Sequence, residues 1–232
     1  MLKEFINREN EIFDILDKLK DNEIDFILIG GYAVSAFKHR FSVDADIVVK
    51  EEQLNKIIEI LEKNNFKPYK AMNLENIYNG KFRAFVKNAG LSVTVDLLIN
   101  AVSSRQTDAS WSFELFKNNH IGVEVKGIEK SIKLNIPVRE LLIATKIHAC
   151  RLTDVRDVVA MCEGADINKM VDFAKRGDLT KLKDCINRFK EITKNKNFID
   201  AFKGVFSIEK LPSNNIEFSE KMINKLEQAI TR

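Results

Sequence analysis

Three aspartates in two strand-like segments are the residues of this chain most able to do chemistry. Asp44 and Asp46 lie in the apolar run 44–49, and Asp96 lies in the run 91–99. Side chains alternate along a strand, so Asp44 and Asp46 point to the same face. Like charges this close disfavour ionisation unless a cation lies between them. A hard divalent ion with oxygen ligands, Mg²⁺ by default, would fit such a pair.

Asp96 interrupts a segment that is otherwise largely apolar. An acid in such a place must be paired, bound to a metal or placed at the open edge of a sheet. If its strand neighbours 44–49, the three carboxylates converge and, together with substrate phosphates, can hold two divalent ions. Asp96 then suits the general base, or a ligand of the ion nearest the nucleophile. The alternative is an incidental surface pair, Asp44 and Asp46, that binds nothing.

A glycine pair comes before the acidic segment. The apolar run 26–29 has the length of a strand, Gly30 and Gly31 end it, and residues 32–37 are predicted to form a short helix. Glycine lets the backbone approach a ligand closely, and the N–H groups at a helix start favour an anion such as phosphate. A Gly-Gly turn is common between a strand and a helix, so by itself it indicates little.

Taken together, these features resemble the nucleotidyltransferase superfamily, which has the polymerase β-like fold. A strand, a Gly-Gly turn, a helix, an Asp-x-Asp strand and a later lone Asp follow in the expected order, with 12 residues between Gly31 and Asp44. The superfamily often has Ser at the position of Gly31, and that hydroxyl usually contacts a triphosphate. Ser35 or Ser42 are the candidates to replace it. The resemblance implies an enzyme that moves a nucleoside monophosphate from an NTP to a hydroxyl, with two Mg²⁺ held by Asp44, Asp46 and Asp96.

Two further segments are similar to the AbiEii-type toxin nucleotidyltransferases and their relatives. The run 40–46 has the form Arg-x-Ser-x-Asp-x-Asp, and residues 146–160 resemble a Lys-x-x-Ala…Arg-Asp-x-x-Asp segment in which Ala160 replaces the last acid. This resemblance covers about residues 25–165. It implies that the triphosphate contacts Lys146, that the acceptor is the 3′ end of an RNA such as tRNA or a protein hydroxyl, and that a cognate antitoxin is the partner. The residues that it assigns to nucleotide binding are Gly30, Gly31, Arg40, Ser42, Lys146 and Asp157.

The residues themselves leave other interpretations open for the charged side chains. Lys146 follows an apolar helical run, where its side chain could equally reach water at the edge of the helix. Asp154 and Asp157 could form a surface ladder of ion pairs with neighbouring arginines. Arg83, on a predicted strand at 82–87, fits either a phosphate contact or a charge on an edge strand.

The composition excludes several classes of protein. The chain has 232 residues, with 37 basic and 34 acidic side chains, so the net charge of +3 argues against a non-specific nucleic-acid coat. Three cysteines exclude a disulfide scaffold, and the apolar runs are too short to cross a bilayer. There is no P-loop and no Gly-x-Ser-x-Gly motif. We therefore expect a soluble, cytoplasmic protein with no membrane partner.

The order of the predicted elements indicates an α+β protein. We predict a nucleotidyltransferase-like mixed sheet with flanking helices in residues 1–137, followed by an all-helical domain in residues 138–232. The predicted helices of the first domain span 2–20 and 51–64, and its other strands span 82–87, 121–125 and 128–134. Residues 139–232 hold 18 basic and 14 acidic side chains, which slightly favours an RNA acceptor.

Two other functions compete with the enzyme. One is a non-catalytic protein of the same fold that binds nucleotide or nucleic acid, or acts within a complex. The other is a structural or regulatory domain whose acids are incidental. Variants of Asp44 and Asp46 distinguish the first from an enzyme, because an enzyme loses turnover whereas a binding protein keeps its partner.

Overall fold

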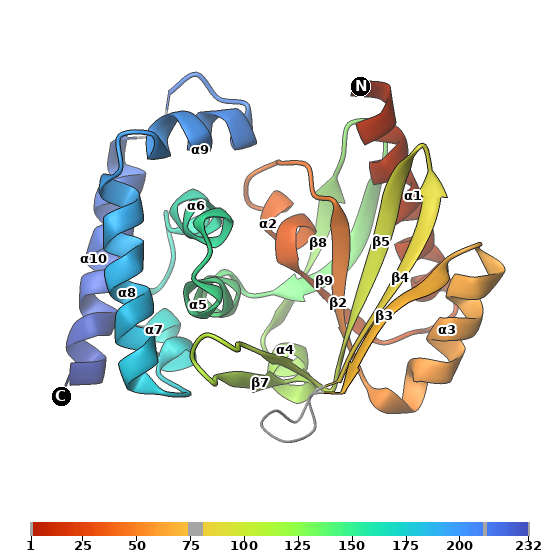
Figure 1. The fold of residues 1–232 in the computed structure, drawn as a ribbon, viewed down its shortest axis with the longest axis horizontal. Coiled ribbons are helices and arrows are strands. Elements are labelled where there is room, and N and C mark those ends of the chain that lie inside the picture. Colours follow the sequence, from red (N-terminus) through yellow and green to blue (C-terminus); the bar gives the residue numbers. More distant parts are fainter. Residues whose placement is uncertain (1, 74–80, 211–212, 232) are drawn as a thin grey trace. The chain divides into compact units, whose positions relative to one another are not determined.

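The computed structural model describes residues 2–73, 81–210 and 213–231, and it divides the chain into two compact units (Figure 1). The sheet unit comprises Met1–Val102 and Trp111–Pro137, and the helical unit comprises Ser103–Ser110 and Val138–Arg232. In the described residues, no helix is long and apolar enough to cross a membrane.

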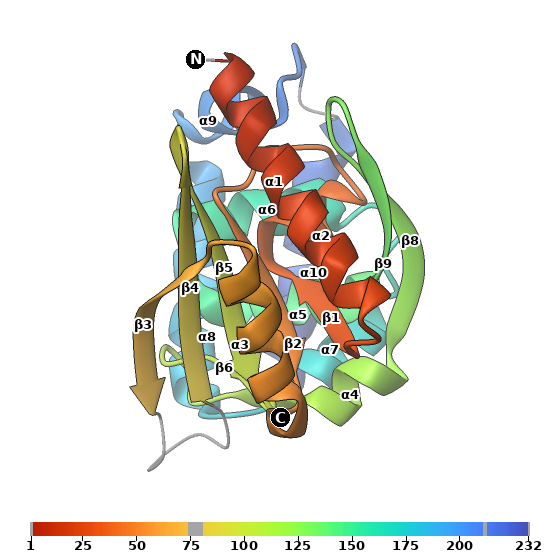
Figure 2. The same ribbon diagram turned by 90° about the vertical axis from the view of Figure 1, so that its right-hand side faces the viewer.

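Within its described residues, the sheet unit contains a five-stranded mixed sheet in the order β1–β2–β5–β4–β3 (Figure 2). β2 and the central strand β5 run parallel, and all the other neighbours are antiparallel. The register places Asp46 beside Asp96, which fixes where the acidic side chains meet. The strands are β1 (Phe26–Ile29), β2 (Asp44–Val49), β3 (Lys67–Asn73), β4 (Lys81–Ala89) and β5 (Leu91–Ile99).

Alternation along β5 separates the core from the site. Val93, Val95 and Leu97 are fully buried, whereas Asp96 and its neighbours on the other face are only partly covered. Two helices, α1 (Leu2–Asp21) and α3 (Leu54–Lys63), lie across one face of the sheet (Figure 2). Burial of each such aliphatic side chain contributes about 1.5–3 kcal/mol, so this apolar layer fixes the strand that carries Asp96.

The remaining elements of the sheet unit are short. α2 (Gly30–Ser35) follows β1 directly, and the hairpin of β8 (His120–Lys126) and β9 (Ser131–Pro137) lies beside β1. β6 (Ala101–Ser103) pairs with β7 (Ser110–Ser112), and α4 (Phe113–Asn118) comes next. α4 begins after Ser112, whose hydroxyl accepts the N–H of Leu115 at 3.2 Å, an ordinary N-cap.

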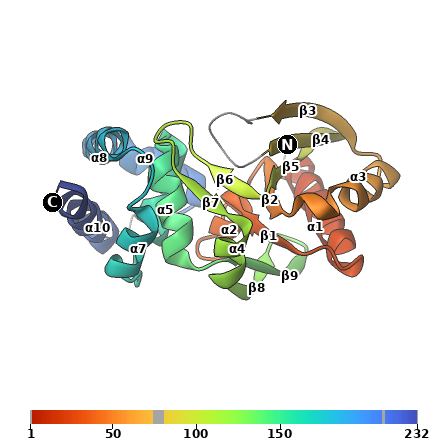
Figure 3. The same cartoon turned by 90° about the horizontal axis from the view of Figure 1, so that it is seen from below.

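The described part of the helical unit consists of six α-helices and the segment Ser103–Ser110. α5 packs against α6, α7 and α8, and Figure 3 shows it beside α7 and α8. Fully buried His148 on α5 joins the inserted segment to α7, because its Nδ1 lies 2.6 Å from Thr107 Oγ1 and its Nε2 donates to the carbonyl of Ala174 at 2.7 Å. The helices are α5 (Arg139–Ala149), α6 (Leu152–Met161), α7 (Ile167–Ala174), α8 (Leu179–Lys194), α9 (Phe198–Phe206) and α10 (Ser213–Thr231).

The α+β prediction, a mixed sheet with flanking helices followed by C-terminal helices, is confirmed. The short helix after β1 begins at Gly30, two residues earlier than predicted. β3, β6, β7 and α4 were not predicted. β3 is an edge strand that contains Lys67 and Pro68, residues that protect an edge but weaken the apolar pattern of a strand.

Candidate active site

Asp44, Asp46 and Asp96 come together on the sheet. Each offers a carboxylate oxygen, and these oxygens all lie within 4.8 Å of one another. The cause is the parallel pairing of β2 with β5, which sets Asp46 beside Asp96 and leaves Asp44 on the same face. All three side chains are partly exposed, and three hard oxygen donors this close suit a divalent cation such as Mg²⁺.

Gly30 touches this cluster through its backbone. Its φ of +67° favours glycine, and a Cβ at this position would lie 1.9 Å from Asp46 Oδ2. Any larger residue would therefore have to displace the carboxylate. The close approach explains why a glycine follows β1 beside Asp46.

Gly31 makes room for two other predicted site residues. A Cβ on Gly31 would lie 2.3 Å from Ser42 Oγ and 2.8 Å from Arg40 Nη2. The hydroxyl of buried Ser42 thus fills the space of a side chain at position 31, and it donates to Asp44 Oδ1 at 3.3 Å. Ser35 instead donates to the carbonyls of Gly31 and Arg40, so it holds the turn.

Three buried residues near the loop that leads to Asp44 were not predicted from the sequence. Tyr32 donates to the carbonyl of Ser42 at 3.2 Å, and Arg8 and Glu9 of α1 are 7% and 1% exposed. The pKa of Tyr32 lies well above its ordinary value, because burial and then the charge of Glu9 disfavour the phenolate. Arg8 and Glu9 could have been noticed, because helical spacing from Phe5 to Ile12 puts them on the apolar stripe.

Lys146 and Asp157 lie in the helical unit, in a buried ion cluster. Lys146 Nζ is 2.9 Å from Asp157 Oδ2 and 3.0 Å from Asp154 Oδ1, and the three residues are 8%, 1% and 0% exposed. Burial alone would lower the pKa of Lys146, but the two carboxylates raise it above its ordinary value. Burial would likewise raise the pKa of Asp154, but Lys146 and then Arg151 hold it below its ordinary value.

These ion pairs correct two of the sequence interpretations. Lys146 does not reach water at a helix edge, and Asp154 and Asp157 are not on the surface. The contact of Lys146 with a triphosphate stays a prediction. Arg83 lies opposite Leu97, whereas Ala84 lies opposite Asp96, so alternation turns Arg83 away from the carboxylate face. The interpretation of Arg83 as a phosphate contact at this site is therefore not supported by the strand register.

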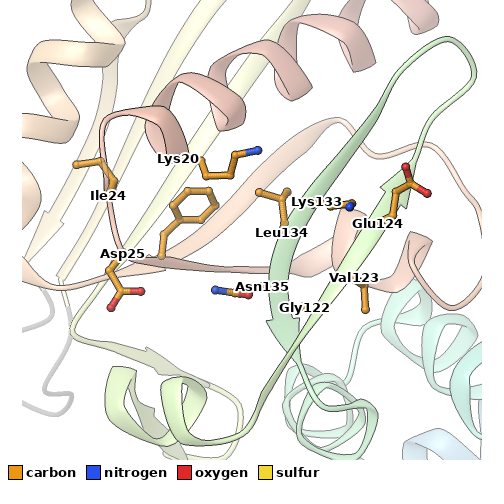
Figure 4. Close-up of a pocket in the computed structure, with 10 residues that line it drawn as sticks. Lys20, Ile24, Asp25, Gly122, Val123, Glu124, Lys133, Leu134 and Asn135 are labelled. Atoms are coloured by element: carbon orange, nitrogen blue, oxygen red, sulfur yellow. The ribbon is translucent and has the colours of Figure 1, made fainter.

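A separate hollow of about 450 Å³ lies between the start of β1 and the β8–β9 hairpin (Figure 4). Its lining mixes apolar side chains such as Phe26 with charged ones such as Lys20 and Lys133. None of the three clustered aspartates lines it. The hollow is therefore separate from the carboxylate cluster.

No protein-family model matches the chain, and no curated protein matches it. Among solved structures, the antibiotic-resistance factor ANT(2'')-Ia matches with a TM-score of 0.51 at 14% identity, over 71% of this chain and 88% of that one. The lincosamide antibiotic adenylyltransferase LnuA, bound to lincomycin, gives 0.47 at 17% identity over 68% and 98%. JHP933 from Helicobacter pylori gives 0.47 at 14% identity over 98% and 93%. The likeness to ANT(2'')-Ia shows that the chain has a nucleotidyltransferase-like fold, as predicted.

Proposed function

We propose that the chain is a metal-dependent nucleotidyltransferase that moves a nucleoside monophosphate from an NTP to a hydroxyl and releases pyrophosphate. The observation that carries the proposal is the meeting of Asp44, Asp46 and Asp96 within 4.8 Å, beside a glycine turn. A surface pair of incidental acids would need neither the third carboxylate nor the close approach of Gly30 to Asp46. The shared fold supports the same conclusion.

The three aspartates would hold one or two Mg²⁺, for which their hard oxygen donors are suited. When bound, such ions supply positive charge to phosphate oxygens and lower the pKa of an attacking hydroxyl. Among the chain's own groups, Asp96 is the candidate to accept the proton of the acceptor hydroxyl. It lies on β5, whereas Asp44 and Asp46 both lie on β2. Its partial exposure leaves it accessible to an acceptor.

The nucleotide would be held by the turn and by the residues that crowd it. Ser42 replaces the hydroxyl that the superfamily often carries at position 31, because its Oγ fills that space and reaches Asp44. Arg40, whose Nη2 lies against Gly31, supplies a cation for phosphate oxygens. We give Lys146 and Asp157 a structural role, because the ammonium of Lys146 already faces two buried carboxylates.

For the acceptor, we propose the 3′ end of an RNA such as a tRNA. The support is the AbiEii-type resemblance of residues 40–46 and the basic excess of residues 139–232. A small molecule with a hydroxyl group is the competing acceptor, because ANT(2'')-Ia is described as an antibiotic-resistance factor. The toxin role, the cognate antitoxin and a protein acceptor stay predictions of the resemblance.

The test is transfer of label from each α-³²P-NTP in turn, in buffer with Mg²⁺ and total cellular RNA, followed by a denaturing gel. We expect a labelled RNA band that disappears in the Asp44→Asn/Asp46→Asn variant. Label on the protein itself would indicate modification of the chain or of a partner. If no NTP gives label on RNA, protein or a panel of aminoglycosides and lincosamides, the non-catalytic alternative replaces the enzyme.

A further inference from the structure

Arg8 is a buried cation for which the described residues provide no counter-ion. The side chain is 7% exposed, and its Nε is enclosed without a hydrogen-bond acceptor in the described part of the chain. The contact found for its guanidinium is with the ring of Phe5, 5.1 Å away. Burying an unpaired charge is costly, so proteins normally pair such a group or use it to bind a ligand.

Glu9, the acid next to Arg8 in the sequence, is already engaged elsewhere. Glu9 Oε2 accepts the N–H of Ile128 at 2.7 Å, and Glu9 Oε1 lies 3.9 Å from His39 Nε2. A Cβ on Gly127 would lie 2.4 Å from Glu9 Oε2, so the tip of the β8–β9 hairpin closes around this carboxylate. Glu9 therefore anchors the hairpin and the loop before β2 instead of neutralising Arg8.

Arg8 lies near the loop that leads to Asp44. The ring of Phe5 packs against that of Phe41 at 5.9 Å, and Phe41 stands between Arg40 and Ser42 in the loop that leads to Asp44. The charges of Arg8, Arg40 and Asp44 also act on the buried hydroxyl of Tyr32, after burial itself and Glu9. Two guanidinium groups thus act on the same tyrosine, whose hydroxyl donates to the carbonyl of Ser42.

We propose that Arg8 is an anion-binding residue that, together with Arg40, receives a phosphate group beside the cluster of Asp44, Asp46 and Asp96. A guanidinium presents a planar set of donors that fits phosphate oxygens in pairs, and the low exposure of Arg8 strengthens such contacts. The proposal rests on the proposed function for the identity of this phosphate as part of a nucleotide or of an acceptor. The binding of an inorganic phosphate compound does not depend on turnover.

The test is calorimetric titration of inorganic pyrophosphate in buffer with Mg²⁺, using the full chain and three variants. We expect Arg8→Met to weaken binding about tenfold or more, which is the effect of losing a charge-assisted hydrogen bond. Arg8→Lys keeps the charge without the paired donors, and should lose less. Lys3→Met is the matched control, because Lys3 is an exposed cation on the same helix, and it should bind pyrophosphate as the wild type does.

Melting temperatures separate ligand binding from a structural role. Without ligand, Arg8→Met should melt at the wild-type temperature or above it, because the variant removes an uncompensated buried charge. Pyrophosphate should raise the melting temperature of the wild type, but barely that of the variant. A variant that melts lower yet binds pyrophosphate normally would overturn the proposal. If Arg8→Met does not fold, wild-type affinity in Arg8→Lys would overturn it equally.

Two further titrations identify the source of the phosphate. A loss of affinity in Arg8→Met for NTPs assigns the residue to the nucleotide, and a loss for a 5′-phosphorylated RNA oligonucleotide assigns it to the acceptor. If the wild type binds pyrophosphate through Arg8 but transfers no label to any acceptor, the anion site stands and the proposed function fails. If the wild type binds no pyrophosphate, the anion site is refuted, whatever the transfer assay gives.

Discussion

Replacing Lys146 by Met should remove a large part of the stability of the helical unit. In the wild type, the ammonium of Lys146 lies between Asp154 and Asp157, at 3.0 and 2.9 Å, and all three groups are buried. Breaking a buried ion pair from one side generally costs about 3–5 kcal/mol, because a charge is left in the interior without its compensation. Asp154 keeps its 2.6 Å hydrogen bond from Arg151 Nε, so we expect the lower end, about 3 kcal/mol.

That loss is large enough to measure in more than one way. For a chain of this size, about 3 kcal/mol corresponds to a fall in melting temperature of about 6–12 °C. Urea unfolding followed by far-UV circular dichroism reports mainly on helices, whereas fluorescence of Trp111, the chain's single tryptophan, reports on the sheet unit. We expect the larger shift in the dichroism curve. Lys183→Met, which removes an exposed lysine from α8, is the matched control and should change little.

A double variant tests the reasoning behind this number. Lys146→Met/Asp157→Asn removes the cation together with one of its carboxylates, so its loss should be clearly smaller than that of Lys146→Met alone. If Lys146→Met unfolds at the wild-type urea concentration and instead weakens NTP binding, the structural role is refuted. In that case the ammonium is available to a triphosphate, as the resemblance to the AbiEii-type enzymes implied.

Three further predictions concern the site and its supports. Asp96→Asn should lower the rate of label transfer at least about 100-fold without lowering the melting temperature, because it removes one of three mutually repelling charges. Gly30→Ala should lower transfer and also cost about 1–2 kcal/mol in urea unfolding, because φ is +67° and the new Cβ would meet Asp46. Gly90→Ala is the control for the backbone term, because Gly90 has a similar φ of +84° but open space around it. Burial lowers the pKa of His148 to about 4, so the unfolded chain binds the extra proton between about pH 6.5 and 4. Stability should therefore fall by up to about 3 kcal/mol as the pH falls through this window, and a His148→Gln variant should show a flatter curve in urea titrations.

The acidic cluster shows what alternation along a strand can and cannot predict. The period of two was enough to put Asp44 and Asp46 on one face, and the apolar run around Asp96 was enough to mark that acid as unusual. The meeting of all three depended on β5 pairing with β2 rather than with β1 or another strand. Strand order follows from long-range packing. The sequence could therefore predict that the three carboxylates meet only if these two strands were neighbours.

The glycine turn illustrates a different limit. Two adjacent glycines after a strand are compatible with many loops, and nothing local distinguishes them. In the structure, a Cβ at Gly30 would clash with Asp46, and a Cβ at Gly31 would clash with Ser42 and Arg40. These residues all lie at least nine positions later in the chain. The spacing between the glycine turn and the aspartates was the basis of the family resemblance. Only the folded geometry shows that two missing side chains make room for Asp46, Ser42 and Arg40.

Arg8 and Lys146 are alike in one respect that bears on both proposals. Each is a buried cation on the apolar stripe of a helix, and the helical spacing says nothing about its partner. For Lys146 the partners come from the next helix, eight and eleven residues along the chain, so the charge is compensated within the fold. For Arg8, adjacent Glu9 is engaged with Ile128, and the guanidinium lies over the ring of Phe5. The same pattern in the sequence thus leads to opposite expectations: a Met variant should destabilise the protein at Lys146 but not at Arg8. Measuring both melting temperatures tests whether the first charge stabilises the fold and the second binds a ligand.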